Sequence, residues 1–356
     1  MRMLLVSVVC VVAVACGRTQ PVDYSGLYDD ELFDAGMQKP DAGRELVPCM
    51  TGELTPEPAV PAVMLVVDRS GSMNFDFAGN SGGLFGNPLT GPRRWSVLRT
   101  TLEATLSQVD QQVAFGMVSF PSDNSCGVSS SIELMPRAGN GTAILNRLMR
   151  TPVGGTPTAE AIMAAGDQLS SVRGQALVLI TDGDPNCNSS LDPATCDCTS
   201  PRVGFPPECT DAEACRDADK TTEAIRKLRE EKGIITYVIG VGAQAPLVLT
   251  ALDNMAIAGG VPRMGSTRSF YNGETESEFT EALNAVSAHL TRCTWATGTR
   301  LGPNDLVEVR VGGDFVQQGA MGWDWVDQSS GDLTLKGMWC ERAAAGDAVK
   351  VILQCR

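Results

Sequence analysis

The sequence predicts an α/β protein with a doubly wound, mainly parallel sheet, followed by a small all-β module. Unbroken apolar runs such as Ala62–Val67 and Ala176–Ile180 are typical of strands that are buried on both faces of a sheet. Segments with apolar residues at helical spacing alternate with these runs, which indicates parallel strands joined by crossover helices. After residue 293 the pattern changes to short alternating strands separated by glycine-rich turns, which is typical of β hairpins.

The N-terminus has the pattern of an export signal over residues 1–15. Its apolar run, from Leu4 to Ala15, is too short to span a bilayer as a mature helix. Small residues precede Cys16, and this arrangement resembles the cleavage site of bacterial lipoproteins. The resemblance implies a lipid on Cys16 and an exported protein anchored in the cell envelope, at the outer membrane if the host is Gram-negative. An ordinary secretory cleavage site is the alternative.

Three further segments follow the signal. Residues 17–48 are rich in Asp, Gly and Pro without sustained periodicity, so we expect a flexible acidic tether over residues 16–59. We place the main α/β domain at residues 60–292 and the β module at residues 293–356.

Helices and strands alternate along the main domain. Trp95, Leu98 and Leu102 recur at helical spacing and predict a first helix with one apolar face. By the same periodicity arguments, later strands are expected at 113–120, 131–134, 176–181, 234–241 and 268–271, and later helices at 142–150, 156–171, 212–231, 246–258 and 279–290.

The first apolar run ends in three oxygen-bearing side chains, Asp68, Ser70 and Ser72. They follow the carboxyl end of a strand, which is where open α/β sheets bind their ligands. Hard oxygen ligands suit magnesium, manganese or calcium. A turn whose serines cap the next helix is the alternative interpretation.

This segment resembles the first signature of the von Willebrand factor A family, in which Asp-x-Ser-x-Ser opens a metal-ion-dependent adhesion site. Gly154–Ile162 is similar to the family's Gly-Gly-Thr-Pro loop, which implies that the Thr156 hydroxyl binds the metal. Ala176–Pro185 resembles the family's Thr-Asp-Gly element, which implies that Asp182 lies beside the metal. The three signatures occur in the family's order, and the resemblance covers roughly residues 60–292.

The charge balance of this set suits a divalent cation, Mg²⁺ first and Mn²⁺ or Ca²⁺ as alternatives. Asp68 and Asp182 supply two negative charges, and the three hydroxyls are neutral, so a bound ion stays electrophilic toward an outside oxygen. The resemblance implies that a partner protein supplies that oxygen from an exposed Asp or Glu. The other hypotheses are a structural envelope protein and, less favoured, a metal-dependent hydrolase.

An enzyme is disfavoured because the single histidine, His289, lies on a predicted helix far from the motifs. The formal net charge of −14 opposes binding to nucleic acid. Two insertions, at 74–94 and 185–212, directly follow motifs, so we expect both to surround the metal-bearing face.

Ten cysteines remain outside the signal and Cys16, and an even number in an exported chain indicates disulfides. Cys49 precedes the first strand and Cys293 follows the last helix, so a Cys49–Cys293 bridge would close the main domain. Cys340 and Cys355 both lie in the β module and form the second expected pair. Parity then pairs Cys126 with one of the five cysteines between residues 187 and 215, and the candidates are Cys187, Cys196, Cys198, Cys209 and Cys215.

Overall fold

The structure, a computed structural model, describes most of the chain from residue 52 onward. The predictions for the signal, for Cys16, and for Cys49 and Cys355 fall outside the described residues. The described residues are 52–83, 86–171, 176–199, 209, 211–273, 275–302, 305–319, 321–328 and 331–354.

The main domain is built on a six-stranded sheet with the strand order β5-β4-β3-β6-β7-β8. Neighbouring strands are parallel except for β4 and β5, which are antiparallel. All side chains of β6 are buried, as its unbroken apolar run predicts. The predicted mainly parallel sheet is therefore confirmed. The strands are β3 (Ala62–Asp68), β4 (Ala114–Phe120), β5 (Leu134–Arg137), β6 (Ala176–Thr181), β7 (Ile235–Gly240) and β8 (Tyr271–Asn272).

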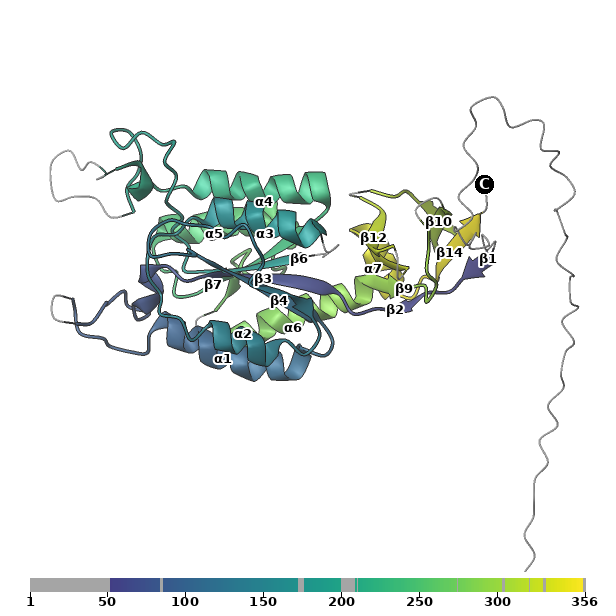
Figure 1. The fold of residues 1–356 in the computed structure, drawn as a ribbon, viewed down its shortest axis with the longest axis horizontal. Coiled ribbons are helices and arrows are strands. Elements are labelled where there is room, and N and C mark those ends of the chain that lie inside the picture. The colour runs from purple at the N-terminus through teal and green to yellow at the C-terminus, as the bar shows by residue number, and fades with distance from the viewer. Residues whose placement is uncertain are drawn as a thin grey trace, which may run out of the picture. The chain divides into compact units, whose positions relative to one another are not determined.

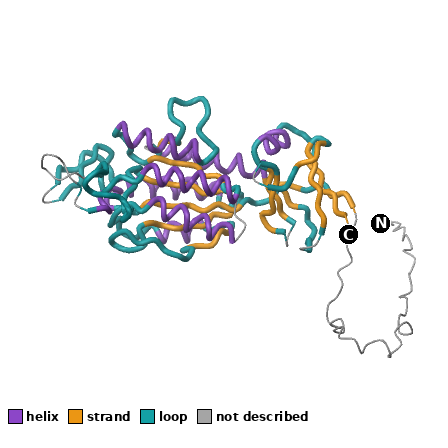
Figure 2. Tube along the Cα trace, turned by 90° about the horizontal axis from the view of Figure 1, so that it is seen from above, coloured by secondary structure: helices purple, strands orange, loops and turns teal. Residues whose placement is uncertain are grey.

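Helices cover both faces of this sheet (Figure 1; Figure 2). One apolar core joins α1, α2 and α6 to the sheet, and a second core joins α3, α4 and α5 to the opposite face. The sheet is thus doubly wound, as predicted. The helices are α1 (Arg94–Val109), α2 (Gly141–Arg147), α3 (Thr158–Ser171), α4 (Ala218–Lys232), α5 (Pro246–Ala258) and α6 (Glu276–Cys293).

Local sequence explains where two of these helices begin and end. The Thr275 hydroxyl accepts a hydrogen bond from the backbone N–H of Glu278 (3.2 Å), so it caps the start of α6. Gly233 ends α4 with a φ of 66°, a left-handed conformation that glycine adopts without steric cost.

Phe279→Ala should destabilise the main domain by about 3–5 kcal/mol, because Phe279 is fully buried between α6 and the sheet and its loss leaves a cavity. Guanidinium unfolding followed by circular dichroism at a helical wavelength measures this change. Phe315→Ala is the matched control: Phe315 is 59% exposed, and its removal should change the unfolding free energy by less than about 0.5 kcal/mol. Equal effects of the two substitutions would contradict this packing.

The β module contains two four-stranded sheets, β1-β14-β10-β11 and β12-β13-β9-β2, and every pair in them is antiparallel. The predicted module of antiparallel strands is confirmed, and it also holds one short helix, α7 (Met338–Ala344). Its strands are β1 (Gly52–Leu54), β2 (Glu57–Pro58), β9 (Thr294–Ala296), β10 (Leu306–Val311), β11 (Asp314–Val316), β12 (Trp323–Asp327), β13 (Asp332–Leu335) and β14 (Val349–Gln354).

Two strands of the β module come from the segment before the main domain. In β1, Gly52 pairs with Leu353, and in β2, Pro58 pairs with Trp295. Both strands lie in the part of the sequence that was predicted to be the end of the tether. They have only three and two residues and no alternating pattern, so their pairing depends on strands far away in the chain.

One disulfide corrects two predicted pairings. The structure bonds Cys293 to Cys340, with Cα atoms 5.0 Å apart, in place of Cys49–Cys293 and Cys340–Cys355. The two predicted pairings assume that one disulfide closes the main domain and a separate disulfide lies within the β module. Instead α6 leads directly into β9, and α7 packs against α6, so the two cysteines meet across this contact.

Within the described residues, no helix is long and apolar enough to cross a bilayer.

Candidate metal centre

Asp68 lies at the carboxyl end of β3, in the middle of the sheet, and its side chain is fully buried. Two donors hold the carboxylate. The Thr181 hydroxyl donates to Oδ2 (2.6 Å), and the backbone N–H of Ser70 donates to Oδ1 (2.8 Å). The parallel register of β3 and β6 brings Thr181 to the same level as Asp68. The orientation of this carboxylate is therefore fixed by both neighbouring segments.

The two serines follow in a tight turn. Residues Gly71–Asn74 form a 3₁₀ helix, and the hydroxyl oxygens of Ser70 and Ser72 lie 3.0 Å apart. Met73 is fully buried and anchors this turn in the core. The backbone N–H of Gly71 donates to the carbonyl of Gly154 (3.0 Å), so the first and second motifs are in direct contact.

Asp182 lies just beyond the end of β6 and is 6% exposed. Its Oδ2 accepts a hydrogen bond from Nη1 of Arg94 (2.8 Å), at the start of α1. Sequence reasoning missed Arg94, because nothing in its neighbourhood marks it as facing a strand end 88 residues away. The third motif therefore carries a buried ion pair as well as the predicted carboxylate.

Thr156 is 4% exposed and comes from the loop before α3. Its backbone N–H donates to the side-chain oxygen of Asn186 (2.7 Å), and its carbonyl accepts from the backbone N–H of Asn186 (2.9 Å). Thr158 donates through its backbone N–H to the same carbonyl (2.8 Å), at the first turn of α3. No role was assigned to Asn186 from the sequence, although the Asp182-x-Asp184-x-Asn186 spacing weakly resembles a calcium loop that lacks its Gly and closing Glu.

A buried arginine holds the surrounding loops. Arg69 is 3% exposed, and its guanidinium donates to the carbonyls of Thr151 (2.8 Å), Pro121 (2.7 Å) and Asp123 (3.0 Å). These carbonyls belong to the loop after β4 and to the loop that leads to Thr156. Arg69 therefore braces the two loops that flank the strand end at Asp68.

When no cation is bound, burial disfavours the ionised forms of both Asp68 and Asp182. Burial raises the pKa of Asp68 to about 7, and the nearby charge of Asp182 adds to this rise. Burial also raises the pKa of Asp182, although Arg94 and the Ser72 hydroxyl oppose the change. Two buried acids that repel each other are stabilised in their charged form by a cation between them.

The residues therefore fit the predicted cation. Buried carboxylate oxygens and neutral hydroxyl oxygens form the donor set that magnesium, manganese and calcium prefer. Asp68, Ser70, Ser72 and Asp182 gather at the ends of β3 and β6, and the loop carrying Thr156 is hydrogen-bonded to the turn after β3 through Gly71.

Both insertions lie at this end of the domain, on the left in Figure 1. The loop after the first motif is organised by Asp76, which is fully buried. Its carboxylate accepts hydrogen bonds from the backbone and side chain of Asn80 (2.7 and 2.9 Å) and of Thr90 (2.7 and 2.9 Å). A fixed loop thus borders the candidate site on one side.

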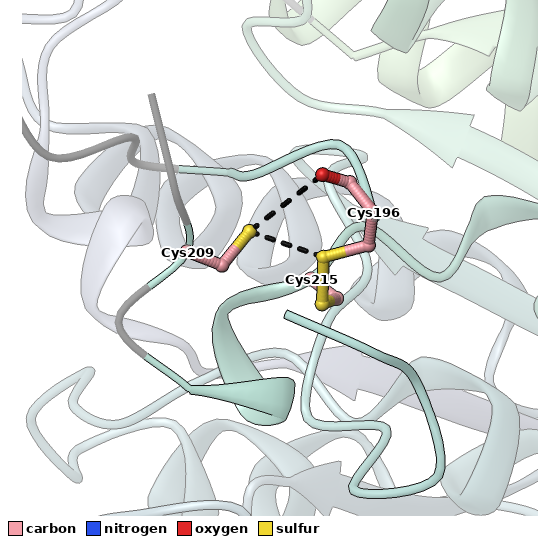
Figure 3. A group of neighbouring side chains, drawn as sticks. All are labelled: Cys196, Cys209 and Cys215. Carbon is pink, nitrogen blue, oxygen red and sulfur yellow. Dashed lines mark hydrogen bonds between the residues drawn. A yellow bond between two sulfur atoms is a disulfide. The ribbon is translucent and has the colours of Figure 1, made fainter. Parts of the chain in front are cut away.

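The second insertion is held by disulfides. Cys126 is bonded to Cys187, one of the five partners left open by the sequence, and the other pairs are Cys196–Cys215 and Cys198–Cys209. Figure 3 shows Cys209 beside the Cys196–Cys215 bridge, with its sulfur 3.1 Å from that of Cys196. All of these sulfurs are in disulfides, so this cluster offers no thiolate to zinc.

Comparison with known proteins identifies one matching family and several similar solved structures. The sequence profile of the von Willebrand factor type A domain matches residues 63–184. A search of curated proteins found no match. The similar solved structures include the pilus adhesin SpaC from Lactobacillus rhamnosus GG, at 16% identity and a TM-score of 0.45, covering 84% of this chain and 39% of that chain.

Two further structures are similar. The PilB minor pilin from Streptococcus sanguinis has 18% identity and a TM-score of 0.44, covering 67% of this chain and 62% of that chain. The manganese-loaded TRAP protein from Plasmodium vivax has 17% identity and a TM-score of 0.39, covering 66% of this chain and 75% of that chain. This chain thus spans 39% of the SpaC chain and less than two thirds of PilB. The family assignment rests on the matched residues and not on these structures: the chain contains a von Willebrand factor type A domain, and the predicted resemblance is confirmed.

Proposed function

We propose that this protein binds a protein partner through a divalent cation held by Asp68, Ser70, Ser72, Thr156 and Asp182, with an Asp or Glu of the partner as the outside ligand. One observation carries the proposal: the carboxyl of Asp68, whose pKa is raised by burial and further by the charge of Asp182, lies at the strand ends beside the hydroxyls of Ser70 and Ser72. When bound, a divalent ion would supply an electrophilic position for an oxygen from outside.

Charge balance favours an acidic ligand over a neutral one. Asp68 and Asp182 together carry two negative charges when ionised, and Arg94 already offsets part of the charge on Asp182. A divalent ion added to this set makes the centre net positive, since the hydroxyls are neutral. A carboxylate from a partner then restores neutrality, whereas a carbonyl or a hydroxyl does not.

Binding is favoured over hydrolysis because each candidate base has a cationic partner or is packed away from the strand ends. Asp184 accepts from Arg216 (2.6 Å), and Glu160 accepts from Lys220 (3.4 Å). His289 packs against Tyr237 with ring centroids 6.1 Å apart, and burial lowers its pKa. A general base must lie within hydrogen-bond reach of the proton that it removes. The ion pairs hold Asp184 and Glu160 toward Arg216 and Lys220, and His289 packs on Tyr237.

Mg²⁺ is the first choice of cation, with Mn²⁺ and Ca²⁺ as alternatives, because the donor set is all oxygen. Anchoring through a lipid on Cys16 in the cell envelope, at the bacterial outer membrane, is part of the same proposal. It is motivated by the small residues before Cys16 and would place the metal centre in an exported compartment.

Capture of a protein from envelope extract by the immobilised chain should require the cation. We expect a specific protein to be retained in magnesium, released by EDTA, and retained again when magnesium or manganese is added. Mass spectrometry of the eluate identifies it, and alanine substitution of its exposed Asp and Glu residues then finds the ligand. Retention at full strength in EDTA would support a structural role instead, and turnover of a substrate panel would support the hydrolase.

A further inference from the structure

The Cys126–Cys187 disulfide crosses the end of the strand that carries Asp68. Cys126 lies in the loop after β4, and Cys187 lies in the loop after β6. β4 and β6 flank β3 on its two sides. The bridge, with a Cα–Cα distance of 5.6 Å, therefore ties together two loops that the sheet itself does not pair.

The residue before each cysteine holds the loop of Thr156. The carbonyl of Ser125 accepts a hydrogen bond from the backbone N–H of Gly155 (2.8 Å). Asn186 accepts from the next backbone N–H, that of Thr156, through its side-chain oxygen (2.7 Å), and donates its own N–H to the Thr156 carbonyl (2.9 Å). Consecutive amides of the loop are thus held by the two segments that the disulfide joins.

The disulfide also packs directly on this loop. A Cβ added to Gly155 would lie 2.4 Å from Sγ of Cys187 and 3.2 Å from Sγ of Cys126, so only glycine fits there. Cys187 has a φ of 72°, which is uncommon for a residue with a side chain and persists only where the surroundings enforce it. Its backbone N–H donates to the carbonyl of Glu213 (2.9 Å), which holds it in this conformation.

We propose that the Cys126–Cys187 disulfide and Asn186 position Thr156 for the divalent cation, so that the site depends on this bridge and not on the other disulfides of the insertion. The inference rests on the proposed function, because it assumes that Thr156 is a metal ligand. Neither cysteine is a ligand of the ion. Both sulfurs act by fixing the backbone from which the Thr156 hydroxyl projects.

The test measures binding of Mn²⁺ alone to the purified chain by isothermal titration calorimetry. The Cys126→Ser/Cys187→Ser double variant should bind Mn²⁺ about tenfold more weakly than wild type, or worse, as for loss of other groups that orient a ligand. The Cys198→Ser/Cys209→Ser double variant removes a disulfide from the same insertion and is the matched control. Its affinity should stay within about twofold of wild type, because neither of its sulfurs is among the three atoms nearest to a Cβ placed on Gly155.

A spectroscopic measurement distinguishes the displacement of Thr156 from a general loss of rigidity in the variant. Terbium luminescence lifetimes in H₂O and D₂O count the water molecules bound to the ion. The Cys126→Ser/Cys187→Ser variant should show about one more bound water than wild type, since water replaces the Thr156 oxygen. Thr156→Ala, which removes the same oxygen directly, should give the same count and is the reference.

Asn186 provides a second test that leaves the disulfide intact. Asn186→Ala removes the acceptor of the Thr156 N–H and should weaken Mn²⁺ binding, whereas Asn186→Asp keeps an acceptor and should bind at least as tightly as wild type. Wild-type affinity and water count in both the cysteine variant and Asn186→Ala would overturn the positioning role alone. Failure of wild type to bind Mn²⁺ or terbium would overturn the proposed metal site together with it.

Discussion

Asp68→Ala is expected to abolish cation binding and, with it, partner capture. The substitution removes one of two charged ligands from the centre, and we expect the Mn²⁺ affinity to fall by more than about a hundredfold, beyond the usual loss for an outer-shell group. Calorimetric titration with Mn²⁺ measures the change, and the capture assay in magnesium should lose the retained protein.

The fold should survive this substitution. Alanine in place of Asp68 would leave the Thr181 hydroxyl and the Ser70 N–H without their acceptor, at about 1–3 kcal/mol for each buried donor. Loss of the repulsion between Asp68 and Asp182 offsets part of that cost. Asp167→Ala is the control, since its side chain is 64% exposed on α3, and it should bind Mn²⁺ as wild type does. Full Mn²⁺ affinity in Asp68→Ala protein with native circular dichroism would contradict the proposed ligand set.

Without a divalent cation, the stability of the main domain should fall as the pH rises from about 5 to about 8. The reason is that burial raises the pKa of Asp68 in the fold from its ordinary value of 3.8 to about 7. A folded-state pKa above the unfolded value means that the folded protein holds the proton more tightly. The stabilisation is therefore complete below the unfolded pKa and is lost as the pH passes through the folded one.

Thermal unfolding in EDTA across this pH range measures the effect. The carboxyl of Asp182 acts in the same direction, because burial raises its pKa too. Asp68→Asn should flatten the profile, since the amide does not ionise and keeps the shape of the side chain. Magnesium should raise the melting temperature of wild type more at pH 8 than at pH 5, because the cation competes with the proton. The lowered pKa of His289 acts in the opposite direction in both proteins, so a wild-type profile in EDTA that falls no more steeply than that of Asp68→Asn would contradict the buried acid pair.

The candidate site could be predicted largely because it follows from strand ends. Apolar runs place Asp68 and Asp182 at the carboxyl ends of β3 and β6, and parallel pairing brings those ends together. The loop of Thr156 was predicted from its resemblance to a family motif, and the structure links it to the turn after β3 through Gly71 and Gly154. Local sequence was therefore sufficient to predict the positions of Asp68 and Asp182, which lie at the ends of regular strands.

The features that could not be predicted depend on contacts between segments that are distant in the sequence. Hydrophobic periodicity gives no information about such contacts. Arg94 meets Asp182 only because α1 begins beside the end of β6, and Asn186 meets Thr156 only through the folded insertion. The Cys293–Cys340 bridge was missed because the contact between α6 and α7 has no local signal. The same holds for β1 and β2, whose few residues pair with the far end of the chain.

The most direct measurement is anomalous diffraction at the manganese edge from crystals grown with manganese. We predict one strong anomalous peak among the side-chain oxygens of Asp68, Ser70, Ser72, Thr156 and Asp182, with one position of the metal taken by water or by a carboxylate from a neighbouring molecule. The absence of a peak there, or an ion whose shell is completed by this chain alone, would contradict it.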